Sequence, residues 1–219
     1  MPLETFTHKG TDVSIRVKSQ FGDTSGAQVS DDAILRWIND AQREIVNSNF
    51  LLRDTKYADI QIGVHDYSFP NDKVLLIEAL YVDGKPIEGV TIQQAREFML
   101  SRDPDFTRQE DMPVIWYERA GVITIYPKPN RNITAGLKIE YLKVPTDLTA
   151  MTDSLGVPDR YFNELTNYVI AQAMEMDENF SAATYKYSQF REGLNRLSYK
   201  DNMNQTDLYF QIVPDPEDY

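Results

Sequence analysis

The chain has 219 residues, of which 42% are hydrophobic and 26% charged, so it can bury a substantial core. It contains no cysteine, which excludes disulfide bonds and thiolate metal sites. Acidic residues outnumber basic residues 34 to 22, and the net charge is −12. This excess argues against a protein that grips nucleic acid, because such proteins bind phosphates through clusters of lysine and arginine. An acidic wall would instead let DNA pass without adhering.

Membrane and export signals are weak in this sequence. No apolar run approaches the roughly 18 residues that a membrane-spanning helix requires. The first 11 residues lack the basic start and apolar core of a signal peptide. We therefore expect a soluble intracellular product, or an assembly built from one, without a membrane partner.

The sequence predicts the second element more clearly than the first. In residues 11–22, Val13, Val17 and Phe21 are spaced as on a short helix, whereas Val13, Ile15 and Val17 alternate as in a strand, and the residues alone leave both open. Residues 30–47 predict a helix that Ser30 caps. Its expected buried stripe consists of Ile34, Trp37, Ile38, Ala41 and Ile45.

From about residue 57 to residue 144 the apolar period changes to two, which indicates short strands. Ile60, Ile62 and Val64 alternate, and further apolar runs cover residues 74–82, 114–118, 122–126 and 137–144. Glycine-containing turns separate several of these runs. We predict an antiparallel sheet or small sandwich that includes a short helix over residues 91–101 and an exposed loop over residues 102–112.

Residues 157–200 predict two helices separated by a polar break at residues 177–179. The apolar stripe of the first helix is Phe162, Leu165, Val169, Ala173 and Met176, and that of the second is Ala183, Tyr187, Phe190, Leu194 and Leu197. So short a break predicts an antiparallel hairpin. Its apolar faces must pack against other elements, and the helix over residues 30–47 supplies part of that packing. Gly193 either permits the close approach of another helix or marks fraying.

The C-terminal segment, residues 202–219, contains no lysine or arginine and is rich in acids near its end. Its apolar residues are Leu208, Tyr209, Phe210, Ile212 and Val213. A lone strand this apolar should either pack on its own domain or add to the sheet edge of another chain. We therefore predict these five residues as candidate partner contacts.

These elements predict an α+β fold. Residues 1–56 and 145–201 would form an antiparallel helical bundle, and residues 57–144 would form an inserted antiparallel β lobe with its short helix at 91–101. Residues 202–219 would be an extended acidic tail.

Signals for catalysis or ligand chemistry are nearly absent. The two histidines, His8 and His65, are far apart, and His65 beside Asp66 is expected to be a solvated turn residue. No G-x-S-x-G elbow and no glycine-rich phosphate loop occur. The acids Asp103, Asp105, Glu110 and Asp111 lack the glycine and glutamate positions of a calcium-binding EF-hand loop. We predict no enzyme activity, no catalytic residue, no cofactor and no metal site.

Four segments carry a resemblance to a known family. They are residues 29–41, residues 113–117 together with 122–129, residues 137–149, and the hairpin that begins at Val157-Pro158. Their order and spacing, over roughly residues 11–200, resemble those of tailed-phage head-to-tail adaptor (connector) proteins, a group that includes tail tubular protein A of short-tailed phages. Because members begin with a short helix, the resemblance favours a helix for residues 11–22.

The resemblance implies a structural role in the neck or tail of a virion, after assembly in the host cytoplasm. Such adaptors form a ring, usually of twelve copies, on the portal, extend the DNA channel and offer a docking surface to tail tube, nozzle or fibre proteins. The bundle would contact ring neighbours and the portal, and DNA would pass without specific binding. Two alternatives remain open: a tail or tail-fibre-associated binding module that uses the β lobe, and a glycan-active virion enzyme.

Overall fold

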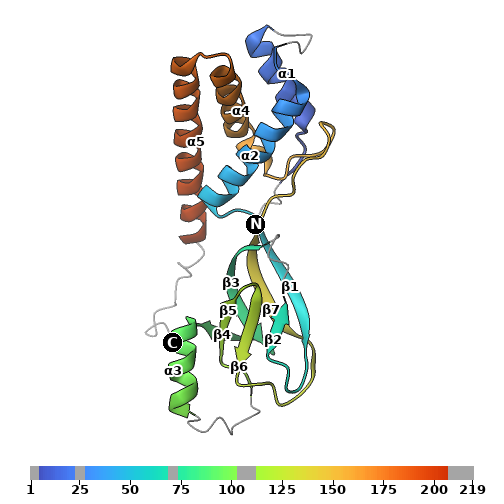
Figure 1. Ribbon diagram of the computed structural model, residues 1–219, viewed down its shortest axis with the longest axis vertical. Helices are drawn as coiled ribbons and strands as arrows, with labels where there is room; N and C mark the ends of the chain where they lie inside the picture. The colour runs from blue at the N-terminus through green and yellow to red at the C-terminus, as the bar shows by residue number, and fades with distance from the viewer. Residues whose placement is uncertain (1–4, 23–27, 69–73, 103–111, 207–219) are drawn as a thin grey trace, which may run out of the picture. The chain divides into compact units, whose positions relative to one another are not determined.

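The computed structural model describes residues 5–22, 28–68, 74–102 and 112–206, with side chains as far as residue 198 (Figure 1). The fold is α+β and has five α-helices and one seven-stranded sheet within these ranges. The chain divides into two compact units. Met1–Asn49 and Pro145–Tyr219 form the helical unit, and Phe50–Val144 form the β unit.

The helical unit is arranged around one central helix. It comprises α1 (Gly10–Phe21), α2 (Asp31–Asn49), a short 3₁₀-helix (Asp159–Tyr161), α4 (Phe162–Met176) and α5 (Phe180–Thr206). Helix α4 contacts α1, α2 and α5 (Figure 1). Helices from the N-terminal part of the chain and the helix that follows α4 therefore cover its surface.

The first element is a helix, as the resemblance favoured. Val13 and Val17 are fully buried, whereas Ile15, which a strand would place on the same face, is 67% exposed. The helix ends because Gly22 adopts the left-handed conformation at φ +64°, and its N–H donates to the carbonyls of Lys18 and Ser19.

The buried stripe of α2 differs in part from the predicted one. Ile34, Ile38, Ala41 and Ile45 are buried, but Trp37 is only half-buried. The stripe includes Ala33, Gln42 and Val46 instead. The buried face is thus rotated away from Trp37 and includes the Gln42 side chain, whose amide forms hydrogen bonds.

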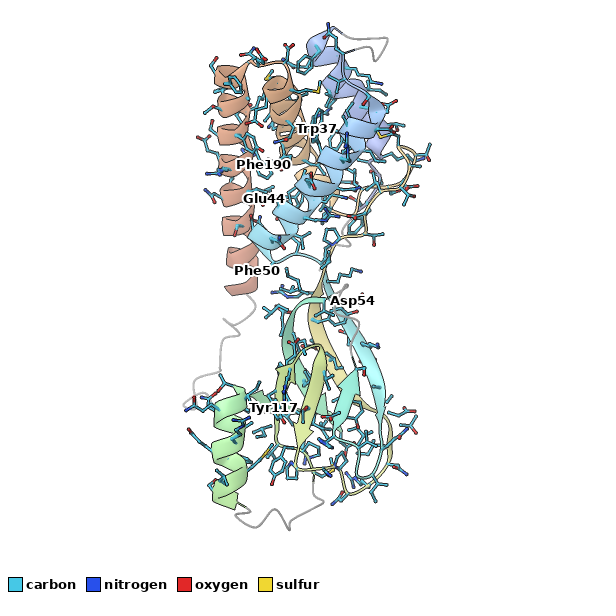
Figure 2. All side chains as sticks on the ribbon, in the orientation of Figure 1. Trp37, Glu44, Phe50, Asp54, Tyr117 and Phe190 are labelled. Carbon is cyan, nitrogen blue, oxygen red and sulfur yellow. The ribbon has the colours of Figure 1, made fainter. Side chains whose placement is uncertain are left out.

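The α4–α5 hairpin has the predicted break between Met176 and Phe180. Its helices run antiparallel, since Tyr168 contacts Phe190 while Gln172, one turn later, bonds to the hydroxyl of Tyr187. Phe190 is 2% exposed and lies between the two helices (Figure 2). The prediction that Met176 is buried is wrong: it is 51% exposed, because α4 ends there.

Helix α5 is longer than its apolar stripe indicates. It runs to Thr206, so the first residues of the segment predicted as an extended tail are helical. Glu164, near the start of α4, packs against Gly193. Helix α5 therefore continues 13 residues beyond the level of Glu164, or about 20 Å at 1.5 Å per residue.

The β unit contains the strands β1 (Arg53–Ile60), β2 (Asp66–Ser68), β3 (Val74–Val82), β4 (Lys85–Gly89), β5 (Ile115–Arg119), β6 (Val122–Tyr126) and β7 (Ile133–Lys143). Helix α3 (Ile92–Arg102) lies between β4 and β5 in sequence. The strand order is β1-β7-β3-β4-β5-β6-β2. Isoleucines from β1 and β6, strands near opposite ends of this order, share one core, so the sheet is curled.

The expectation of a purely antiparallel sheet is wrong at one pair of strands. β4 and β5 are parallel, with Glu88 opposite Ile115 and Gly89 opposite Trp116. A parallel pair requires a long crossover connection, and the segment that contains α3 provides it. The sheet is therefore mixed.

Two details at the start of the β unit also differ from expectation. β1 begins at Arg53, within the range predicted as helical bundle, and most of its side chains are exposed. Ile62 and Val64 do not extend it: they are 51% and 37% exposed and lie outside the strands, because the chain turns at Gly63, whose φ is +75°.

Candidate functional site

A groove of about 490 Å³ lies between α1 and α4 in the helical unit. We call it the α1–α4 groove. Its lining consists of Ile15, Arg16, Ser19 and Gln20 from α1, and Asn163, Thr166, Asn167 and Ile170 from α4. Ile15 is 67% exposed whereas Ile170 is buried. The groove thus combines an apolar part with several amide and hydroxyl groups, a composition suited to a peptide or protein ligand.

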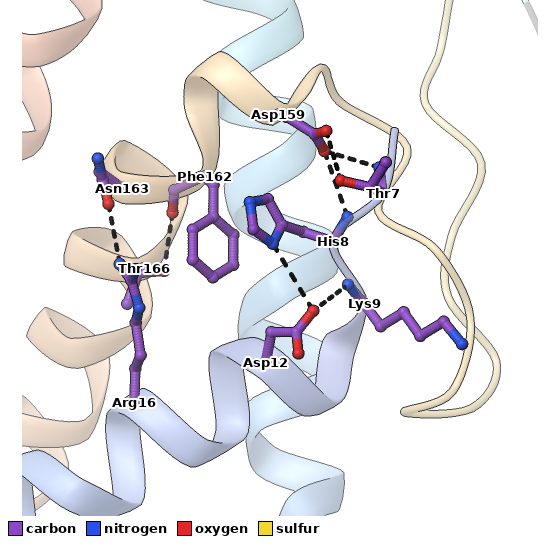
Figure 3. Close-up of polar contacts among 9 residues, drawn as sticks. All are labelled: Thr7, His8, Lys9, Asp12, Arg16, Asp159, Phe162, Asn163 and Thr166. Atoms are coloured by element: carbon purple, nitrogen blue, oxygen red, sulfur yellow. Dashed lines mark hydrogen bonds and ion pairs between the residues drawn. The ribbon is translucent and has the colours of Figure 1, made fainter. Parts of the chain in front are cut away.

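An aromatic stack contacts Arg16, one of the residues that line this groove. The rings of His8 and Phe162 are parallel within 17°, with centroids 3.8 Å apart. The Arg16 guanidinium lies 4.5 Å from the centroid of the same Phe162 ring, and its Nη1 donates to Oδ1 of Asn163 at 2.8 Å (Figure 3). Ring and amide together orient the Arg16 cation at the surface of the groove.

The N-terminal segment that carries His8 is held by Asp159, in the 3₁₀-helix before α4. Its carboxylate accepts hydrogen bonds from the N–H and hydroxyl of Thr7, at 2.8 and 2.6 Å, and from the N–H of His8 at 3.2 Å (Figure 3). Partial burial raises the pKa of Asp159, but hydrogen bonds from Thr7, Thr5 and His8 outweigh it and lower the pKa to about 2. The ionised carboxylate therefore fixes the N-terminal segment beside α4.

Helix α1 is anchored to the same region through its first turn. Asp12 accepts a hydrogen bond from the N–H of Lys9 at 2.8 Å and lies 3.7 Å from Nδ1 of His8. Gly10 approaches the loop before α4 so closely that a Cβ there would lie 3.0 Å from the carbonyl oxygen of Met151. These contacts set the position of α1, and hence the width of the α1–α4 groove.

A buried carboxylate lies on the opposite side of α4, where it contacts α5. Glu164 is 5% exposed, and its Oε1 is 3.4 Å from the guanidinium of Arg196. Its Oε2 is the buried side-chain atom without a hydrogen-bond partner among the residues described. The Glu164 side chain fills the space beside Gly193, so this glycine permits the close approach of α4.

Most of the candidate residues predicted from the sequence lie outside the part of the chain that the structure describes. The predicted partner contacts, Leu208, Tyr209, Phe210, Ile212 and Val213, lie outside the described residues, as do the acids Asp103, Asp105, Glu110 and Asp111. His65 precedes β2, is 39% exposed at its side chain, and lies 3.6 Å from Asp66, in agreement with a solvated turn position. Among the described residues, no group of three or more histidines or acids is arranged to hold a metal ion.

Sequence reasoning missed the residues of the α1–α4 groove. One signal was present, because Ile15 is an isoleucine on the face opposite Val13 and Val17 once a helix is assumed. An apolar residue on the polar face of an amphipathic helix indicates contact with something other than the core. The groove residues of α4, by contrast, could not be identified from the sequence, because tertiary packing brings them to the groove.

Comparison with known proteins gives the chain a family. Residues 10–211 match the model of the SU10 adaptor protein family. No curated protein sequence matches the chain. The match extends past Asn202, where the predicted resemblance ended, and includes Leu208, Tyr209 and Phe210. In the described ranges, no helix is long and apolar enough to cross a membrane.

The match supports the adaptor class that the four sequence segments predicted, while the closer likeness to tail tubular protein A stays a prediction. It covers far more than half of the residues. The chain therefore belongs to the SU10 adaptor protein family and is a structural adaptor protein of a phage virion.

Proposed function

We propose that the chain forms a ring of twelve copies that joins the portal to tail tube, nozzle or fibre proteins and extends the DNA channel. The observation that carries this proposal is the family match over residues 10–211. An adaptor acts by binding one structure on each of two sides. The division of the chain into a helical unit and a β unit offers two separate surfaces for such contacts.

In this proposal the helical unit is an antiparallel bundle that contacts ring neighbours and the portal, and the β unit faces the tail. Large apolar side chains at the end of the α4–α5 hairpin support an interface there: Met176, Phe180 and Tyr185 are 51%, 63% and 62% exposed. Apolar groups that gather at one exposed tip are typical of protein contacts. The protein works by assembly rather than by catalysis and is built into the virion in the host cytoplasm.

The charge distribution supports passage of DNA without specific binding. The helical unit contains 20 acidic and 10 basic residues, whereas the β unit contains 14 and 12. The net charges are therefore −10 and −2. A channel wall made mainly of the acidic unit would repel the phosphates of a sliding duplex.

Mixing the purified chain with portal rings tests the proposal. Light scattering after size-exclusion chromatography should give a complex whose mass equals the portal plus one ring of adaptor chains. The isolated chain should be monomeric or weakly associated under the same conditions. A chain that remains monomeric beside portal rings at every concentration would contradict the adaptor role.

One observation favours the second candidate, a tail or tail-fibre-associated binding module that uses the β unit. A hollow of about 270 Å³ on this unit is lined by apolar residues of β3 and by Glu118, Gly121 and Ile123, and its Leu75 and Leu76 are 38% and 50% exposed. In that case Leu76→Asp should abolish binding of tail proteins while portal attachment is unchanged. Loss of portal attachment in the same variant would argue against this assignment.

A further inference from the structure

The α1–α4 groove has a charge that is unusual for its unit. None of its eight lining residues is acidic, and Arg16 is the charged residue among them. Acids outnumber bases two to one in the helical unit as a whole. The exposed Ile15 adds an apolar contact, and the amides of Asn163, Asn167 and Gln20 can bond to a peptide backbone. The groove therefore suits an extended peptide that is apolar and carries negative charge.

Residues 207–219 of the same chain have this chemistry. The segment contains the apolar residues between Leu208 and Val213, four acids and no base. The acids are Asp207, Asp215, Glu217 and Asp218. A run of apolar residues followed by acids matches a groove that offers Ile15 beside Arg16, through burial of apolar surface and opposite charge.

The geometry of α5 separates this segment from the groove of its own chain. Helix α5 ends at Thr206, about 20 Å beyond the level of Glu164 and Asn163 along the hairpin. The groove also lies on the α1 side of α4, and packed helices are spaced about 8–10 Å apart (Figure 1). An extended chain gains about 3.3–3.6 Å per residue, so seven residues bring Val213 at most about 25 Å from Thr206.

These spacings put the groove at least about 22 Å from Thr206 in a straight line through the protein, and a chain must take the longer path around α4 or α5. Leu208 reaches at most about 7 Å from Thr206, so the apolar run from Leu208 to Val213 cannot lie along the groove of its own chain. A neighbouring copy is under no such limit. Contact between the tail of one copy and the groove of the next is heterologous, which is the kind of contact that builds rings.

We propose that the α1–α4 groove binds residues 207–219 of a neighbouring copy of this chain. The apolar residues lie against Ile15, and the acidic end lies toward Arg16. This inference rests on the proposed ring, in which each copy has a neighbour. It assigns the C-terminal segment to the adaptor ring itself rather than to the portal.

Binding of a labelled peptide to the full-length chain tests the inference. The peptide has the sequence of residues 206–219, and the chain carries Phe210→Asp, so that its own segment does not compete. Fluorescence polarisation should show saturable binding that weakens as salt is added. Arg16→Glu in this chain should weaken binding at least about tenfold, because a repulsive charge replaces the attractive one.

Matched controls separate the groove from general effects of charge and apolar surface. Arg36→Glu changes the charge by the same amount at an exposed position of α2 and should leave the affinity within about twofold. Ile15→Asp should also abolish binding, whereas Ile62→Asp, at a similarly exposed isoleucine of the β unit, should not. Circular dichroism and melting temperatures establish that each variant is folded.

Several results would overturn the inference. These are absence of peptide binding, and binding that Arg16→Glu and Ile15→Asp leave unchanged. A wild-type chain that stays monomeric yet excludes the peptide would place the segment in its own groove. Peptide that binds portal rings but not the chain would place the segment on the portal. In each case, wild-type chain that still joins portal rings leaves the proposed adaptor function intact.

Discussion

Gly193 on α5 shows how one residue sets the distance between two helices. A Cβ at this position would lie 2.5 Å from Cγ and 2.7 Å from Oε1 of Glu164, which is too close for any real contact. Glycine within a helix costs about 1 kcal/mol relative to alanine. The glycine is therefore explained by the buried Glu164 side chain and not by fraying of the helix.

Gly193→Ala should consequently destabilise the protein, although alanine is the better helix former. We expect a loss of about 1–2 kcal/mol in the free energy of unfolding, because overpacking outweighs the gain in helix propensity. Urea denaturation measures it. The background Glu164→Ala is the matched control, and there Gly193→Ala should become neutral or stabilising. An equal loss in both backgrounds would show that Glu164 is not the cause.

Asp159 links stability to pH at the N-terminal segment. Its pKa is lowered to about 2 from an ordinary value of 3.8, so the folded state favours the ionised form. This contribution is complete above about pH 4 and is lost as the pH falls from about 4 toward 2. Because the group is partly exposed to solvent, its effect should be only about 1 kcal/mol.

Asp159→Asn should therefore lower the free energy of unfolding by about 1 kcal/mol at pH 7, and the difference from wild type should vanish near pH 2. Denaturant titrations at several pH values measure this difference. Glu175→Gln, which removes an exposed carboxylate from α4, serves as the control and should show no such trend. A difference that is constant from pH 7 to pH 2 would contradict the assigned role.

At the scale of elements, α2 holds the loop that leads into α4. Asn39 donates to the carbonyl of Leu148 at 3.1 Å and accepts from its N–H at 2.8 Å. Gln42 is fully buried and accepts a hydrogen bond from the N–H of Gly156. The loop between the β unit and α4 is thus fixed by side chains of a helix more than 100 residues earlier.

Gln42→Leu should cost about 1–2 kcal/mol of unfolding free energy, because it leaves the N–H of Gly156 without its acceptor in a partly buried place. Thermal and urea unfolding both measure the loss. The neighbouring Arg43→Ala breaks an exposed ion pair with Asp147 and should cost less than about 1 kcal/mol. Equal effects of the two changes would refute the importance of the buried bond.

Periodicity predicted the helices better than it predicted the limits of the strands. The stripes of α2, α4 and α5 are mostly confirmed, since one face of a helix repeats over several turns. Trp37 was wrongly placed in the core because the pattern does not show which edge of the apolar stripe faces the neighbouring helices. Met176 was wrongly placed there because the pattern does not show where a helix ends. Residues 11–22 were ambiguous because Val13 and Val17 fit both periods, with Phe21 completing a helical stripe and Ile15 a strand.

In the β unit, the missing information was which strands pair. Residues 53–56 are polar, and they form part of β1 only because β7 pairs with them along its length. Likewise, the parallel register of Glu88 and Ile115 depends on the path of α3 between their strands. The α1–α4 groove follows the same rule: Ile15 gave a local signal, whereas Asn163 and Ile170 reach the groove through packing alone.

For the whole molecule, family membership and charge lead to the same account. The chain belongs to a family of phage adaptors, and its acidic excess lies mainly in the helical unit. An adaptor that lines a DNA channel should repel the duplex rather than bind it. The proposed tail-to-groove contact would then join neighbouring copies through a groove whose eight lining residues include Arg16 and no acid.

A low-resolution electron image of the chain mixed with portal rings tests the central claim most directly. The account predicts a closed ring of adaptor density on one face of the portal, coaxial with its channel and divided into equal subunits. Portal particles that carry no added density at saturating adaptor concentration, or that carry single adaptor chains without closure, would contradict it.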